Sequence, residues 1–213
     1  MKIDFVSDVS CPWCAIGLNA LEQALARVGP EIQATLHFQP FELNPQMGVQ
    51  GQDITEHLAQ KYGIDAAQIA ANTEAIRQRG ASVGFEFGIG KRSRIYNTLD
   101  AHRLLHWAGL QGGGPQRALK HALLKAYFTD GLNPSDAGVL LAAASAAGLD
   151  ADGARAVLDS DTYAAEVHAA EAFYQQQGIH SVPAVIINDR HLISGGQPVD
   201  VFEQALRQIA AEA

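Results

Sequence analysis

Residues 2–17, KIDFVSDVSCPWCAIG, decide the fold of this 213-residue chain. The first six of them alternate apolar and polar side chains and predict a strand. Apolar residues then recur at helical spacing from Leu18 to Val28, so an amphipathic helix follows and ends at the Gly29-Pro30 breaker. Residues 33–38 alternate again. The order strand, helix, strand predicts a right-handed βαβ unit with parallel strands.

The rest of the chain divides into a helical middle and a mixed end. Every periodic segment between residues 53 and 178 has helical spacing, and Asn133 with Pro134 is predicted to begin one of these helices. Residues 184–187 are a continuous apolar run typical of a buried strand; a turn, a second strand and a last helix follow.

These segments predict an α/β protein with a discontinuous main domain. Residues 1–44 (βαβ) and 160–213 (helix, ββ, helix) are expected to share one sheet, and residues 45–159 to form an all-helical insertion.

Composition excludes several classes of protein. The chain has 15 Lys and Arg against 23 Asp and Glu, a net charge of −8, which disfavours nucleic acid and anionic membranes as partners. No run of about 18 apolar residues predicts a membrane span, and the first residues carry two aspartates where a secretory signal is apolar. We therefore expect a cytoplasmic protein.

Cys11 and Cys14 are the only cysteines, and they lie three residues apart at the predicted strand-to-helix junction. Free backbone N–H groups and the helix dipole favour a thiolate at such a position. Pro12 lacks an N–H, which the first helical turn does not need. The spacing lets both sulfurs meet, so we expect a pair that cycles between dithiol and disulfide. Trp13 is expected to be partly exposed, as a contact for substrate.

Two other interpretations of this pair stay open. A structural zinc site would need two further ligands, and no second CxxC exists, although eight histidines do. The pair could also be inert. His102 and His106 have a spacing that can bind metal, but no third ligand is evident, so no metal site is predicted.

Val182-Pro183 directly precedes the buried strand of residues 184–187. A proline at a strand start is one explanation. The other is a cis Val182–Pro183 bond beside the CxxC, which would leave the Val182 backbone free to pair with an extended peptide. Arg92 and Arg94 lie either in a solvated loop or at the mouth of a groove.

Six stretches of the chain resemble the DsbA-type branch of the thioredoxin superfamily, closest to the cytoplasmic FrnE-like dithiol oxidoreductases. They are residues 8–17 (DVSCPWCAIG), 41–45 (FELNP), 97–103 (NTLDAHR), 126–128 (AYF), 178–183 (GIHSVP) and 194–197 (SGGQ).

The resemblance implies a thioredoxin-like fold with a large helical insertion and a cis peptide at Pro183. It implies that Cys11 is the nucleophile, that Cys14 is the resolving thiol, and that Val182 and Pro183 bind substrate together with Pro12 and Trp13. Substrates would be cysteine-containing proteins or small thiols. The redox-active group would be the Cys11–Cys14 disulfide, and no dissociable cofactor is implied. Glutathione is the candidate electron partner. The assembly would be a monomer or a homodimer.

Two features depart from the family pattern. Pro12-Trp13 stands where the periplasmic oxidant of the family has a histidine, so a strongly oxidising potential is not assumed. The related FrnE members carry a second cysteine pair, which this chain lacks. Asp8 would oppose a Cys11 thiolate if its carboxylate pointed that way.

Two alternative functions are also compatible with the sequence. Kappa-class glutathione transferases and 2-hydroxychromene-2-carboxylate isomerases share the architecture but use a serine at the first active position with bound glutathione; the presence of both cysteines argues against them. A non-enzymatic holdase that uses an apolar groove is the other.

Overall fold

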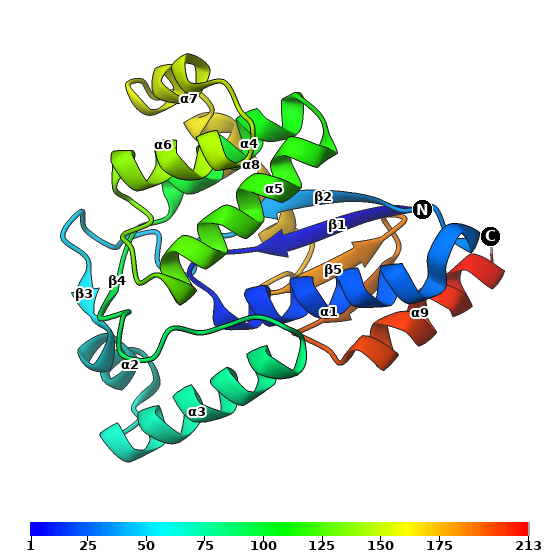
Figure 1. Cartoon of the computed structure of the whole chain (residues 1–213), viewed down its shortest axis with the longest axis horizontal. Helices are drawn as coiled ribbons and strands as arrows, with labels where there is room; N and C mark the ends of the chain where they lie inside the picture. The colour runs from blue at the N-terminus through cyan, green and yellow to red at the C-terminus, as the bar shows by residue number, and fades with distance from the viewer. Residues whose placement is uncertain (213) are drawn as a thin grey trace.

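Four strands form one mixed sheet in the computed structural model, which describes residues 1–212 (Figure 1). They are β1 (Lys2–Ser7), β2 (Thr35–Pro40), β5 (Ala184–Ile187) and β6 (His191–Ser194). Their order is β2-β1-β5-β6; β1 and β2 are parallel, while β5 is antiparallel to both β1 and β6. The first and last parts of the chain therefore share a sheet, as the sequence predicts.

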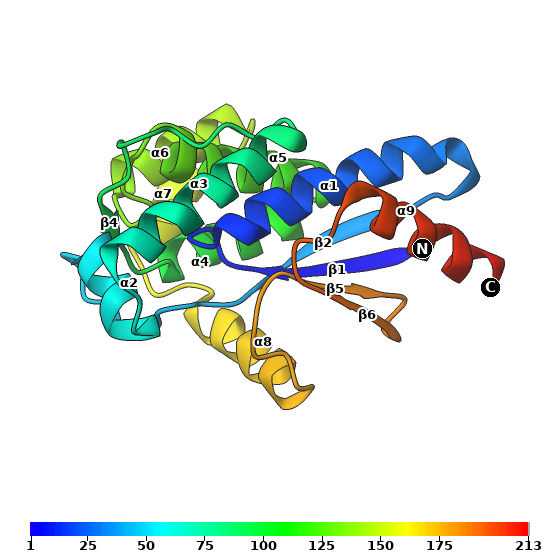
Figure 2. The ribbon, with the colours of Figure 1, turned by 90° about the horizontal axis from the view of Figure 1, so that it is seen from below.

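Helices cover both faces of this sheet (Figure 2). On one face α1 (Pro12–Val28) and α9 (Val199–Ala211) pack side by side over Ile3 and Phe5 of β1. On the other face α8 (Ala164–Gln176) brings Tyr174 to Val6. A short 3-10 helix, Gly29–Glu31, follows α1. Because β1 and β5 are covered on both sides, their apolar residues are almost fully buried, except Ile186, which is partly buried.

Most of the chain between β2 and α8 is helical. The helices are α2 (Ile54–Tyr62), α3 (Ala66–Ser82), α4 (Leu99–Leu110), α5 (Gly113–Leu124), α6 (Ala137–Ala146) and α7 (Ala151–Leu158). A π-helical turn, Lys125–Thr129, continues α5. Helices α4 to α7 enclose an apolar core of their own, with Leu104, Leu119 and Leu140 fully buried in it. No described helix has both the length and the apolar character of a membrane span.

Two local details differ from the sequence prediction. A small antiparallel pair, β3 (Gln52–Asp53) and β4 (Arg94–Ile95), interrupts the helical middle; strands of two residues are too short to show a periodicity. Helix α6 begins later than expected, because Asp136 and not Asn133 caps it by accepting the Val139 N–H at 3.0 Å. The Asn133 side chain instead closes the preceding turn.

The start of α1 lies close to the loops at the end of the sheet. A Cβ atom on Gly17 would come within 3.1 Å of Pro183 Cγ and 3.2 Å of Gly196 Cα, so a larger residue would push these neighbours back by a few tenths of an ångström. A Cβ atom on Gly196 would lie 2.9 Å from the Trp13 carbonyl oxygen. This packing sets the CxxC turn beside Val182-Pro183.

Asp8, at the junction of β1 and α1, is fully buried and holds three segments together. Its carboxylate accepts hydrogen bonds from the Ser10 N–H at 3.1 Å, the Ser10 hydroxyl at 2.8 Å and the Leu43 N–H at 2.8 Å. The Nε2 atom of His102 on α4 lies 3.4 Å from Asp8 Oδ1. Burial by itself would raise the pKa of the Asp8 carboxyl, but His102 and the two backbone N–H groups lower it to about 2.

Asp8→Asn is expected to lower the free energy of unfolding by about 2 kcal/mol, because an amide leaves part of this buried hydrogen-bond set unmatched. Urea unfolding followed by circular dichroism measures the change. Asp161→Asn, at an exposed position, is the matched control and should leave stability unchanged.

The same carboxylate should make the protein acid-sensitive. The pKa of Asp8 in the folded chain is below its ordinary value of 3.8, so its contribution is complete above about pH 4 and declines as the pH falls toward 2. Denaturant midpoints measured from pH 5 to pH 2 should fall more steeply for the wild type than for Asp8→Asn. Parallel curves would contradict this account of Asp8.

Candidate active site

Cys11 is the N-cap of α1, with φ −92° and ψ 115°, and Pro12 occupies the first helical turn. The Cys11 carbonyl accepts from the N–H groups of Cys14 at 3.1 Å and Ala15 at 3.4 Å, which starts the helix. Both cysteines are free thiols. The sulfur of Cys11 therefore lies at the positive end of the α1 dipole, the position that favours a thiolate.

The two thiols differ in their surroundings. Cys11 is 4% exposed and Cys14 is 0% exposed. Burial, followed by the neighbouring Cys11 sulfur, raises the pKa of the Cys14 thiol well above its usual range. A reagent or substrate in solution can thus reach only Cys11, and Cys14 can react only with Cys11 or with a group already bonded to it.

Lys120 of α5 supplies positive charge behind this pair. The side chain is 1% exposed, and its ammonium lies 6.0 Å from the centre of the Phe38 ring. Burial lowers the pKa of Lys120, while Cys14, Asp8 and Cys11 counteract this. Lys120 in turn lowers the pKa of Cys14. Spacing along the sequence did not reveal this buried cation.

Val182 lies opposite the first cysteine. Its carbonyl oxygen is 3.5 Å from the Cys11 sulfur, within reach of an S–H···O contact. The Val182–Pro183 bond is cis. Residues separated by more than 170 positions thus meet at the reactive sulfur.

A cavity of about 880 Å³ opens in front of Cys11, within the size range of small-molecule sites. Cys11, Pro12, Trp13 and Val182 line it, so four of the predicted site residues face one space. Trp13 is 41% exposed, as expected. Pro183 is buried against Gly17 and does not line the cavity. Helices α2 and α3 form the opposite wall, mostly with apolar side chains.

Cationic side chains also border this cavity. Lys61 of α2 donates to the Leu43 carbonyl and to Asn44 Oδ1, both at 2.8 Å, and holds the loop after β2. Arg92 lies over the rings of Tyr127 and Phe128, 5.2 and 4.9 Å from their centres. Arg92 is therefore at the groove rather than in a solvated loop. A ligand with carboxylates would find partners in both cations.

The two histidines of α4 have different surroundings. His102 faces Asp8, and His106 lies against the Tyr163 ring, 5.0 Å between centres. Among the described residues, one other group has ligand atoms close enough to hold a metal: Glu42, His168 and Glu171. The sequence does not predict this group, because Glu42 lies far along the chain from His168 and Glu171.

The whole chain resembles known thioredoxin-like proteins. The model of the DSBA-like thioredoxin domain matches residues 2–207. A probable DsbA oxidoreductase from Streptomyces coelicolor is 34% identical, with 100% of this chain and 91% of that chain covered and a TM-score of 0.90.

Two solved structures with lower identity share the fold. The cytosolic disulfide reductase DsbM from Pseudomonas aeruginosa, solved with GSH, is 16% identical, with 99% and 100% of the two chains covered and a TM-score of 0.68. A 2-hydroxychromene-2-carboxylate isomerase is 12% identical, with 100% and 97% covered and a TM-score of 0.73.

The fold with its helical insertion and the DsbA-type resemblance are thereby confirmed. The chain belongs to the DSBA-like thioredoxin domain family.

Proposed function

We propose that this protein is a thiol–disulfide oxidoreductase that exchanges a Cys11–Cys14 disulfide or dithiol with substrate thiols. The observation that carries the proposal is the placement of the two sulfurs. Cys11 lies at the N-terminus of α1 and lines the cavity, whereas Cys14 is fully buried behind it.

In the oxidising direction a substrate thiolate attacks the Cys11 sulfur of the disulfide. A bond between substrate and Cys11 forms, the Cys11–Cys14 bond breaks, and Cys14 leaves as a thiolate. A second substrate thiolate then attacks the mixed disulfide and releases Cys11, so two electrons pass from substrate to protein. In the reducing direction the Cys11 thiolate attacks a substrate disulfide, and Cys14 resolves the intermediate.

Lys120 is proposed to assist both directions. Cys14 must carry negative charge when it leaves and again when it attacks, and burial disfavours that charge. A nearby buried ammonium stabilises the thiolate without touching the substrate.

The substrates are proposed to be cysteine-containing proteins or small thiols, with glutathione as the small thiol of choice. The size of the cavity and its cations Lys61 and Arg92 support a peptide thiol with carboxylates. DsbM, described as cytosolic and solved with GSH, is 16% identical and shares the fold alone. Glutathione as substrate therefore rests on the cavity, and a cytoplasmic location stays a prediction. Membership of the FrnE-like branch stays a prediction.

The two alternative functions receive less support. The isomerase shares the fold, but at 12% identity that similarity does not extend to its chemistry. A holdase would not need two thiols placed as Cys11 and Cys14 are.

Cys11→Ser is expected to reduce disulfide exchange to the uncatalysed rate, because the buried Cys14 cannot meet a substrate. Cys14→Ser should keep the first step and accumulate a mixed disulfide on Cys11. Insulin reduction and oxidation of a reduced peptide, each in glutathione buffers, measure activity; mass spectrometry under non-reducing conditions detects the adduct. Full activity of Cys11→Ser would end the proposal.

Lys120→Met is expected to slow resolution of the mixed disulfide about tenfold, the effect of losing about 1.4 kcal/mol of charge stabilisation. Stopped-flow measurement of resolution across pH checks this, and the variant should need a higher pH to reach the wild-type rate. Lys125→Met, which removes a neighbouring but exposed ammonium, is the control. Equal profiles for both variants would show that Lys120 only fills space.

A further inference from the structure

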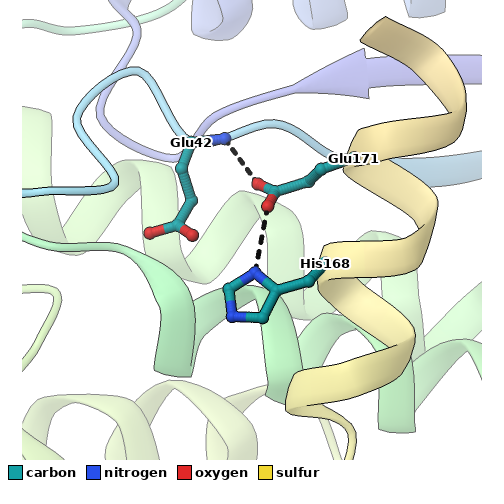
Figure 3. Close-up of side chains that lie close together, drawn as sticks. All are labelled: Glu42, His168 and Glu171. Atoms are coloured by element: carbon teal, nitrogen blue, oxygen red, sulfur yellow. Dashed lines mark hydrogen bonds and ion pairs between the residues drawn. The ribbon is translucent and has the colours of Figure 1, made fainter. Parts of the chain in front are cut away.

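Three side chains with metal-binding chemistry converge beneath the sheet. Glu42 comes from the loop after β2, while His168 and Glu171 lie one turn apart on α8 (Figure 3). Each offers one ligand atom, and the three atoms all lie within 4.8 Å of one another. Figure 3 shows the two carboxylates and the ring around a common gap.

The two carboxylates are deeply buried, with Glu42 7% and Glu171 8% exposed. Glu171 is held in place, since its Oε1 atom accepts the Glu42 N–H at 2.7 Å and its Oε2 atom lies 3.4 Å from His168 Nδ1. Glu42 Oε2 has only the amide of Asn97 at 3.3 Å, and Glu42 Oε1 accepts no hydrogen bond from any residue between 1 and 212. Glu42 Oε1 thus faces the gap and the adjoining cavity without a donor from the described residues.

Positive charge is missing from this cluster. Within residues 1–212 no lysine or arginine forms an ion pair with Glu42 or Glu171. Burial, and then the charge of Glu171, raises the pKa of Glu42 to about 7. Among residues 1–212 only the His168 imidazole pairs with either carboxylate. The remaining buried negative charge is costly unless a cation or a proton compensates it.

We propose that Glu42, His168 and Glu171 bind one divalent transition-metal ion. Two carboxylate oxygens and one imidazole nitrogen form a ligand set that Zn²⁺ accepts, whereas Ca²⁺ and Mg²⁺ prefer oxygen alone. The His168 side chain is 56% exposed, which gives the ion a route from solvent and leaves positions for water.

The ion would also tie α8 to the loop that borders the cavity. Glu42 itself lines that cavity, and the next residue, Leu43, donates its N–H to Asp8. Metal binding is therefore expected to stabilise the substrate side of the sheet. The proposal uses neither cysteine, so it stands or falls independently of the thiol chemistry.

The test is calorimetric titration of ZnCl₂ into the full-length chain carrying Cys11→Ser and Cys14→Ser, which removes the thiols as competing ligands. We expect one zinc ion per chain and a higher melting temperature with zinc. In the same background His168→Ala and Glu171→Gln should each weaken binding at least about tenfold and abolish the thermal shift. His191→Ala, a histidine on β6 outside the cluster, should bind zinc like the parent.

Two results would overturn the proposal. The first is no saturable binding up to about 1 mM zinc, which would mean that a proton on Glu42 relieves the charge. The second is equal affinity of the parent and His168→Ala. Because the His168 ring is half exposed, that variant is expected to fold even if Glu171→Gln does not.

Discussion

The negative charge of Asp8, buried where β1 gives way to α1, is the constraint on which the site depends. A carboxylate without solvent must be compensated by its neighbours; here Ser10 and Leu43 donate hydrogen bonds to it, and the imidazole of His102 lies 3.4 Å away. These residues belong to the CxxC loop, the loop after β2 and the helical insertion. Satisfying one buried charge therefore fixes the relative positions of all three segments. Cys11 follows three residues later and takes its place from that arrangement.

The helical insertion contributes to the chemistry as well as to the cavity wall. Lys120 lies on α5, yet the charges that act on it are Cys14, Asp8 and Cys11 from the first strand-helix junction. A thioredoxin-like sheet without the insertion would expose Asp8 and lose the cation behind Cys14. The negative charge of Asp8 favours the charged form of the buried Lys120 ammonium. The Lys120 ammonium in turn favours the thiolate form of Cys14.

The features that could be predicted from the sequence are those encoded over a few neighbouring residues. The alternation in β1, the run in β5 and the helical spacing of α1 predict a sheet shared by the two ends of the chain, although not the order of its strands. The spacing of Cys11 and Cys14 predicts a helix-start thiol pair. The roles proposed for Lys120 and Glu42 could not be predicted from the sequence, because they depend on contacts with residues far away in the chain. The prediction that Asn133 caps a helix is wrong, because Asp136, three residues later, has the same capping chemistry and accepts the Val139 N–H at the start of α6.

In the proposed exchange reaction, the unequal burial of the two sulfurs would set the order of the steps. Since Cys14 has no access to solvent, every substrate must form its first bond with Cys11, whichever way electrons flow. Cys14 then has a single partner, and its high pKa makes it a poor leaving group unless its charge is stabilised. Under the proposed mechanism the lifetime of the mixed disulfide would therefore depend on Lys120, a residue that does not line the cavity. A related fold that carried the cavity but lacked this buried thiol and cation could bind the same ligands without exchanging electrons with them.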